Sequence, residues 1–365
     1  MISRDAGGGP PHLITSSPPD PPPKGPPTAV LLMNYGGPER AEDCRPYLRN
    51  IFMDPDLIPI PGIVRPLVAS LVSRRRAPIL RKNYEAMGGY SPTLYETTVQ
   101  AQALERALGE GFRCFVGMRY WRPLIGEICA EIVRQGFGRI VLLPIYPHES
   151  QTTTGSSIDE ARRRLTKLSY RGEIAEVRSF WDDPGYLDAL AGQVSQFLAR
   201  LPRETRVLFS AHGLPVSIAR QDPYPGQVLD TVLAVCGRVG IALDPISLPG
   251  VEDRRFAAPA GARWRGGLAW QSKVGPAKWL DPSVEQVLRG WAAEGVKGVA
   301  VVPVAFVNEH SETLYELDVL YGDEARALGM EYARVPTLGV TPGFIEGLAA
   351  RVKRAIGGKK EPGEK

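Results

Sequence analysis

Residues 301–318 read VVPVAFVNEHSETLYELD, and this stretch decides how the chain is interpreted. Its first seven residues are apolar and rich in valine, which predicts a buried strand. The switch to charged residues predicts a helix that Asn308 caps at its start. On that helix Glu312 and Glu316 are four residues apart and share one face, and Glu309 lies three residues earlier on the same side.

This row of glutamates allows two interpretations. A row of carboxylates along a helix most often faces solvent. Here, however, the row directly follows a predicted buried strand, and α/β proteins bind ligands at the carboxyl ends of their strands. Carboxylates stacked on one face also repel one another unless a cation lies among them. The stretch is therefore a candidate ligand or metal site.

The length and composition are typical of a soluble globular protein. A chain of 365 residues is long enough for two domains, and 43% apolar with 23% charged residues is typical of globular proteins. The net charge of +4 is small, and we expect no nucleic-acid partner. The arginine runs Arg74–Arg76 and Arg162–Arg164 are either solvated or face an anionic ligand or membrane surface.

Several kinds of site are absent from the sequence. The four cysteines include no CxxC pair, which indicates neither a disulfide framework nor a zinc site and favours reduced thiols in a cytoplasmic protein. No apolar run is long enough to span a bilayer. The sequence has no Walker A motif, no GxGxxG after a strand and no GxSxG elbow, so we expect no nucleotide cofactor.

Predicted strands and helices alternate from Thr28 onward at spacings typical of parallel sheets with right-handed crossovers. We therefore expect an α/β protein of two domains, each a parallel sheet flanked by helices. The expected segments are a disordered proline-rich leader at 1–27, a first domain at 28–178 plus 341–357, a second domain at 179–340 and a frayed basic tail at 358–365.

Two segments inside these domains have their own character. Residues 57–73 are unusually apolar and run into the arginines at 74–76, so they are expected either to pack as an ordinary helix or to form an apolar lip. Such a lip, over 57–76, would contact an anionic membrane surface peripherally. Residues 240–266 are rich in Pro, Gly and Arg without a clear period, which predicts a long surface loop inserted into the second domain.

The second half of the chain repeats the first. Residues 30–38 read VLLMNYGGP and residues 207–215 read VLFSAHGLP, so each predicted strand is followed by one ring, a glycine and a proline. The match predicts two similar Rossmann-like domains that face each other, with Tyr35 and His212 at equivalent positions across a cleft.

His212 and Glu312 form the sharpest chemical hypothesis. A histidine at a strand end is more often structural than functional, but Glu312 also follows the end of a strand. Such a pair is a general acid–base couple or two ligands of a divalent metal. Two protein ligands hold a metal weakly, which suits a metal that is passed on. The aromatic and arginine residues of the candidate loops suit a flat, apolar ligand with peripheral carboxylates.

The order of motifs resembles that of the ferrochelatases, which insert ferrous iron into a porphyrin to make heme. The resemblance runs from about Thr28 to Ile356 and implies a chelatase-like fold with the porphyrin in the cleft between two domains. Besides the opening stretch, it rests on MNYGGP at 33–38, GGYSP at 88–92, GMRY at 117–120, TTGSS at 153–157, FSAHGLP at 209–215, DPYPGQV at 222–228 and WQSKVGP at 270–276.

The resemblance also implies roles for single residues. His212 and Glu312 match the metal-site residues of the family, and Glu316 matches the next carboxylate of an acidic row. This row commonly continues one turn later, where the chain has Leu320, so a full carboxylate relay is in doubt. The porphyrin-binding residues expected from the motifs are Tyr35, Tyr84, Ser91, Arg119, Tyr120, Ser157 and Trp270.

The mechanism expected from these roles is proton removal coupled to metal entry. Two pyrrole N–H protons leave as Fe²⁺ enters, and a neutral His212 is suited to accept one because its unperturbed pKa is about 6.5. Glu312 then holds iron or passes a proton on, and Glu316 relays that proton away. Remote contacts bend the macrocycle toward the metal.

The resemblance leaves the exact substrate open. Protoporphyrin IX is expected, and coproporphyrin III is the alternative, as are another metal or tetrapyrrole and a heme-binding carrier without turnover. Fe²⁺ is expected as substrate and not as a permanent cofactor. Some members of the family carry an iron–sulfur cluster on carboxyl-terminal cysteines, and the tail of this chain has none, so we expect no cluster.

Overall fold

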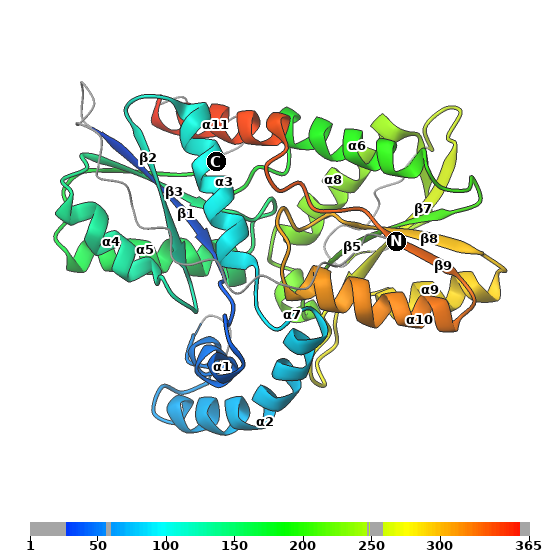
Figure 1. Cartoon of the computed structure of the whole chain (residues 1–365), viewed down its shortest axis with the longest axis horizontal. Helices are drawn as coiled ribbons and strands as arrows, with labels where there is room; N and C mark the ends of the chain where they lie inside the picture. The colour runs from blue at the N-terminus through cyan, green and yellow to red at the C-terminus, as the bar shows by residue number, and fades with distance from the viewer. Residues whose placement is uncertain (1–26, 56–59, 247, 249–257, 358–365) are drawn as a thin grey trace.

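The computed structural model describes residues 27–55, 60–246, 248 and 258–357, and two parallel sheets form its framework (Figure 1). The strand order is β2-β1-β3-β4 in the first sheet and β6-β7-β5-β8-β9 in the second. The predicted α/β architecture is confirmed. The strands are β1 (Thr28–Asn34), β2 (Phe112–Met118), β3 (Arg139–Pro144), β4 (Glu173–Glu176), β5 (Arg206–His212), β6 (Ile241–Leu243), β7 (Trp264–Gln271), β8 (Gly298–Pro303) and β9 (Glu331–Arg334).

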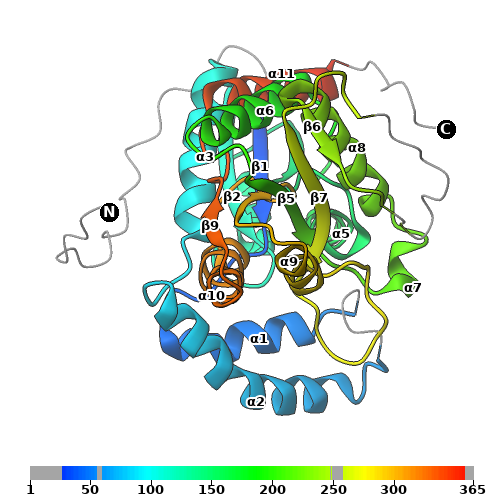
Figure 2. The ribbon, with the colours of Figure 1, turned by 90° about the vertical axis from the view of Figure 1, so that its right-hand side faces the viewer.

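Helices flank both sheets (Figures 1 and 2). They are α1 (Cys44–Phe52), α2 (Arg65–Ala86), α3 (Thr93–Leu108), α4 (Ile125–Arg134), α5 (Ser156–Lys167), α6 (Pro184–Leu198), α7 (Val216–Ala219), α8 (Tyr224–Val239), α9 (Val284–Ala293), α10 (Gly322–Ala327) and α11 (Pro342–Ile356). In β1, Leu31 packs in a core with α4 and α5, whereas Leu32 packs on the other face in a core with α3 and α11. Burial on both faces explains why the central strands are continuously apolar.

The strand register supports the repeat that the sequence predicts. Met33 of β1 pairs with Pro144 of β3, and Ser210 of β5 pairs with Pro303 of β8. Apart from β6, the two sheets have the same order, because β1 lies between β2 and β3 as β5 lies between β7 and β8. The rings two residues beyond Met33 and Ser210 therefore occupy equivalent positions.

The two halves also share an unusual helix type. A first π-helix (Gln151–Gly155) follows β3, and a second π-helix (Glu312–Tyr321) follows β8. π-Helices are rare and often mark functional sites. The acidic row of the sequence therefore lies on a π-helix rather than on an ordinary α-helix.

Two local predictions are wrong. Asn308 does not cap a helix, since the second π-helix begins at Glu312 and the side chain of Asn308 is buried against Thr97 and Gln100. The segment 240–266 is not loop throughout, because it contains β6 and the start of β7. A strand of three residues is too short to show a period in the sequence. The domain bounds remain a prediction.

Helices α1 and α2 project from one end of the molecule (Figure 2). The apolar segment before α2 and its first turns present exposed side chains, with Ile63 91%, Leu67 74% and Leu71 50% exposed. Arg74–Arg76 lie farther along α2. Residues 57–59 of the predicted lip and residue 56 before it, the leader up to 26, residues 247 and 249–257 of the insertion and the tail at 358–365 lie outside the described residues. Among the helices described, none has the length and apolarity needed to cross a membrane.

Candidate active site

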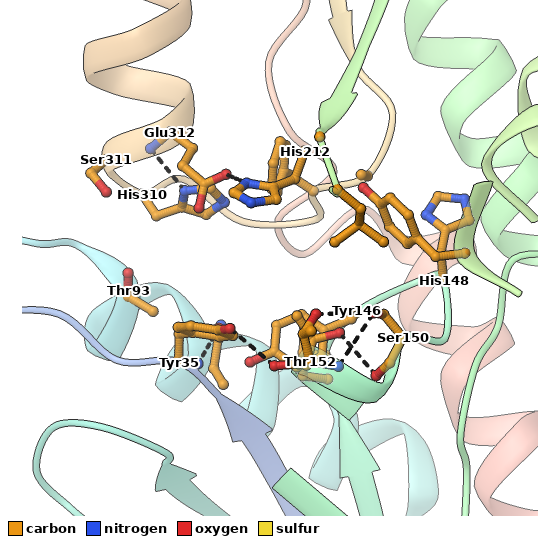
Figure 3. Close-up of a pocket in the computed structure, with 18 of the residues that line it drawn as sticks. Tyr35, Thr93, Tyr146, His148, Ser150, Thr152, His212, His310, Ser311 and Glu312 are labelled. Atoms are coloured by element: carbon orange, nitrogen blue, oxygen red, sulfur yellow. Dashed lines mark hydrogen bonds and ion pairs between the residues drawn. The ribbon is translucent and has the colours of Figure 1, made fainter. Parts of the chain in front are cut away.

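A cavity of about 390 Å³ opens at the carboxyl ends of strands from both sheets. His212, His310 and Glu312 form one wall, and Tyr35 lies opposite them (Figure 3). His212 is the last residue of β5, and Tyr35 directly follows β1. The structure therefore brings the two repeat-related rings to opposite sides of one cavity, as the sequence predicts.

His212 and Glu312 are in direct contact. Nδ1 of His212 lies 2.6 Å from Oε2 of Glu312. Burial favours the neutral acid, but the charge and hydrogen bond of His212 outweigh it and lower the pKa of Glu312 to about 2. Burial also acts to lower the pKa of His212, but the charge and hydrogen bond of Glu312, with the charge of Glu316, raise it overall. The pair therefore holds an ionised carboxylate that faces the cavity.

Glu316 is the opposite case, a carboxyl group that exchanges its proton near neutral pH. Burial, followed by the nearby charge of Glu312, raises the pKa of Glu316 to about 7. Two neighbours donate to its Oε2, the hydroxyl of Ser272 at 2.6 Å and the amide of Gln271 at 3.1 Å. Adjacent carboxylates with such different pKa values are suited to different roles, one to hold charge and one to exchange protons.

Ser272 and Gln271 are functional candidates that the sequence alone does not indicate. The Ser272 hydroxyl lies 3.3 Å from Glu312 and bridges it to Glu316. The Gln271 amide also donates to the backbone oxygen of Glu312 at 3.0 Å. Both residues stand in the motif WQSKVGP, but only the pairing of β7 beside β5 brings that motif to His212.

His310 and His148 also line the cavity without an assigned role. The backbone N–H of Glu312 donates to Nδ1 of His310 at 3.0 Å, and burial lowers the pKa of His310. His148 is almost fully buried, its Nε2 lies 3.0 Å from Oγ1 of Thr231, and burial lowers its pKa to about 3. His148 is therefore neutral in the folded protein.

Glu309 does not join the acidic row, which corrects the prediction of three stacked carboxylates. Its Oε1 accepts from Arg334 at 3.0 Å and from the backbone N–H of Thr337 at 3.1 Å. Its Oε2 accepts from the hydroxyl of Thr313. Despite burial, chiefly the charge of Arg334 lowers the pKa of Glu309. The acidic row therefore consists of Glu312, which lines the cavity, and Glu316 one turn later, which does not line it.

Tyr35 is held in place on the opposite wall. Its hydroxyl donates to the backbone oxygen of Thr152 in the first π-helix at 3.0 Å. Its ring contacts that of Tyr120 at a centroid distance of 4.9 Å and that of Tyr146 at 6.1 Å. Burial raises the pKa of Tyr35, so the phenol is neutral.

The structure separates the expected porphyrin-binding residues into two groups. Tyr35 and Tyr84 line the cavity. The other expected residues lie behind its wall, where their roles remain a prediction: Ser91, Arg119, Tyr120, Ser157 and Trp270. Ser91 bonds to Thr93, and Trp270 packs against Tyr224.

Arg119 is occupied within the protein. Its guanidinium lies 2.6 Å from the buried carboxylate of Asp54 and donates to the Ser156 hydroxyl at 2.9 Å. The hydroxyl of Tyr120 donates to the same carboxylate oxygen at 2.5 Å. Arg119 and Tyr120 therefore anchor the segment after α1 to the first sheet.

A larger metal-binding group is not found among the described residues, where no cluster of three or more His, Cys, Asp or Glu side chains is placed to hold an ion. His212 and Glu312 remain the pair with suitable donor atoms. An imidazole nitrogen and a carboxylate suit a first-row divalent metal.

Comparison with known proteins agrees with the fold and the motifs. The family model described as Ferrochelatase matches residues 27–356. The ferrochelatases of Geotalea uraniireducens and Aquifex aeolicus are 41% and 39% identical over 333 and 330 residues, covering 90% of this chain and 98% and 99% of theirs. SirB from Bacillus subtilis, solved with Fe³⁺, shares the fold with a TM-score of 0.52 at 11% identity, over 90% of this chain and 95% of its own. The chain therefore belongs to the ferrochelatase family of metal chelatases.

Proposed function

We propose that this ferrochelatase inserts Fe²⁺ into protoporphyrin IX in the cavity, at the last step of heme synthesis. The observation that carries the choice of porphyrin is the charge of the cavity wall. Among the described residues that line it, none is Lys or Arg, and Glu312 is the one carboxylate. A buried carboxylate without a cation is costly. Coproporphyrin III carries carboxylates where protoporphyrin IX carries apolar vinyl groups, so this wall favours protoporphyrin IX.

His212 and Glu312 act together in the proposed mechanism. The ionised Glu312 receives Fe²⁺, and the metal's charge offsets the attraction that Glu312 exerts on a proton at His212. His212 then accepts a proton from a pyrrole nitrogen. Glu316, with a pKa of about 7, accepts a proton through the bridging hydroxyl of Ser272. The two pyrrole protons thus have separate acceptors, and no redox change is required.

The direct test is anaerobic Fe²⁺ insertion followed by absorbance, with protoporphyrin IX and coproporphyrin III in parallel. We expect turnover of protoporphyrin IX, at a specificity constant at least about tenfold above that for coproporphyrin III. Faster turnover of coproporphyrin III would contradict the choice of porphyrin but not the reaction. Tight heme binding without turnover of either porphyrin would favour a carrier and overturn the proposed reaction.

We further propose that the start of α2 contacts an anionic membrane surface. The exposed side chains of Ile63, Leu67 and Leu71 supply apolar area, and Arg74–Arg76 supply positive charge farther along the helix. We expect co-sedimentation with vesicles that contain phosphatidylserine, lost in the Leu67→Asp/Leu71→Asp variant. Val340→Asp, at another exposed apolar residue, is the matched control and should still sediment. Unchanged binding of the double variant would contradict the proposal.

The remaining properties follow from the sequence and stay predictions. We expect Fe²⁺ as substrate without an iron–sulfur cluster, nucleotide or nucleic-acid partner, in a cytoplasmic protein that contacts the membrane peripherally. The absorbance spectrum of the purified protein, with iron and sulfide analysis, tests for a cluster. Stoichiometric iron and sulfide would show that the expectation is wrong.

A further inference from the structure

The second π-helix is held from outside the cavity by β9. The guanidinium of Arg334 donates to both carboxylate oxygens of Asp318, at 2.6 and 2.8 Å. The hydroxyl of Tyr332 donates to the backbone oxygen of Leu317 at 2.6 Å. Tyr332 and Arg334 are two residues apart in β9, so their side chains point to the same face of the sheet. One strand face thus contacts the middle of the helix that carries Glu312 and Glu316.

Arg334 also binds the segment in front of the helix. Its NH1 lies 3.0 Å from Oε1 of Glu309, whose other contacts are Thr313 and Thr337. The side chain of Arg334 is only 10% exposed, and that of Glu309 19%. A single shielded guanidinium therefore ties a residue before Glu312 to a residue after Glu316. Neither Tyr332 nor Arg334 lines the cavity.

The need for such a brace follows from helix geometry. A π-helix closes i→i+5 hydrogen bonds, and over more than a single turn it is uncommon compared with the α-helix. Relaxation to i→i+4 bonds would rotate Glu316 relative to Glu312. Glu316 would then leave Ser272 and Gln271, its donors in the structure. Side chains that bind the helix on its outer side oppose that rotation.

We propose that Arg334, assisted by Tyr332, is a positioning residue. It holds the second π-helix in the conformation in which Glu312 and Glu316 are oriented to act on the metal. The inference rests on the proposed function of those two carboxylates. It predicts a specific kinetic defect, because the porphyrin contacts on the opposite wall do not depend on β9. Loss of the brace should weaken the use of Fe²⁺ and leave the use of porphyrin intact.

The test measures KM for Fe²⁺, KM for porphyrin and kcat for Arg334→Met and Arg334→Lys. We expect Arg334→Met to raise KM for Fe²⁺ by about 10- to 100-fold, as when groups that orient metal ligands are lost, with KM for porphyrin within about twofold. Arg334→Lys should have a KM for Fe²⁺ between those of the wild type and Arg334→Met, since a lysine keeps the charge but cannot form the forked pair with Asp318. Arg289→Met, which removes an exposed ion pair between α9 and α10, is the control and should match the wild type.

A second variant separates positioning from stability. Arg334→Met alone leaves Glu309 and Asp318 unpaired, so its melting temperature should fall. Arg334→Met/Glu309→Gln/Asp318→Asn removes the charges together, and we expect it to regain melting temperature but to keep the raised KM for Fe²⁺. If this triple variant regains both, or if Arg334→Met leaves KM for Fe²⁺ unchanged, the inference is overturned.

Hydrogen exchange gives a readout that does not depend on turnover. Backbone amides over 312–321 should exchange faster in Arg334→Met and in Tyr332→Phe than in the wild type, with no change over the first π-helix. Unchanged exchange over 312–321 would overturn the brace. A wild type without iron insertion would overturn the proposed function instead, and the exchange result would still decide whether β9 holds the helix.

Discussion

Ser272 combines a strained backbone with a bridging hydroxyl. It is one of two non-glycine residues with positive φ in the described part of the chain, at +66°, and its hydroxyl joins Glu312 to Glu316. A side chain in the left-handed region costs about 1–2 kcal/mol, so the residue is retained at a cost in stability. The hydroxyl is the group that a glycine cannot supply.

Two substitutions separate these properties of Ser272. Ser272→Ala and Ser272→Gly both remove the hydroxyl, and we expect each to lower kcat by about tenfold or more because the proton path to Glu316 is interrupted. Ser272→Gly should be about 1 kcal/mol more stable than Ser272→Ala, since glycine adopts positive φ freely. Denaturant unfolding and turnover measure the two effects. A fully active Ser272→Gly would show that the hydroxyl has no role.

His148 predicts a pH dependence of stability. The pKa of His148 is about 3 in the folded protein and about 6.5 in the unfolded chain. The contribution of the neutral histidine to the free energy of unfolding is therefore complete above about pH 6.5 and is lost as the pH falls toward 3. Between about pH 7.5 and pH 5 the loss amounts to about 2 kcal/mol. In His148→Gln, the loss of unfolding free energy between about pH 7.5 and pH 5 should be smaller than in the wild type by about 2 kcal/mol. Urea unfolding of both proteins at both pH values measures the difference. Equal losses in both proteins would contradict the neutral, buried histidine.

At the scale of elements, α3 and α8 each contact a loop of the other half of the chain. Gln100 of α3 donates to the backbone oxygen of Val307, in the loop before the second π-helix, and to that of Gly339, in the loop before α11, each at 3.0 Å. Thr231 of α8 contacts His148, before the first π-helix. Each helix therefore fastens the loop that leads into the π-helix of the other half of the chain. One residue from each of these contacts, Val307 and His148, lines the cavity.

Gln100 tests this arrangement. Gln100→Leu removes the side-chain donor to the half-buried carbonyl of Gly339, one of two donors to the buried carbonyl of Val307 and one of two acceptors of the Asn308 amide. We therefore expect a loss of about 1–3 kcal/mol in unfolding free energy. KM for porphyrin should also rise, because Asn308 lines the cavity. Gln135→Leu, at an exposed glutamine of the first domain, is the control and should change stability by less than about 0.5 kcal/mol. A Gln100→Leu protein as stable as the control would contradict the fastening.

For the whole molecule, the sequence predicts the repeat and the central pair but not the geometry around them. His212 and Glu312 could be found because His212 ends an apolar strand and Glu312 lies in the charged stretch that follows another. The π-helix could not, since residues four apart share a face in helices of either kind. The contact of Glu309 with Arg334 and the bridge through Ser272 join segments far apart in the chain, and only the strand order brings them together.

The central claim is that His212, facing Tyr35 across the cavity, accepts a pyrrole proton while Glu312 receives the iron. The most direct measurement is the anaerobic rate of Fe²⁺ insertion into protoporphyrin IX by His212→Ala beside the wild type, with porphyrin binding measured by fluorescence in both. We predict that the variant binds porphyrin normally and inserts iron at least about 100-fold more slowly. Near-normal insertion by His212→Ala would contradict the account.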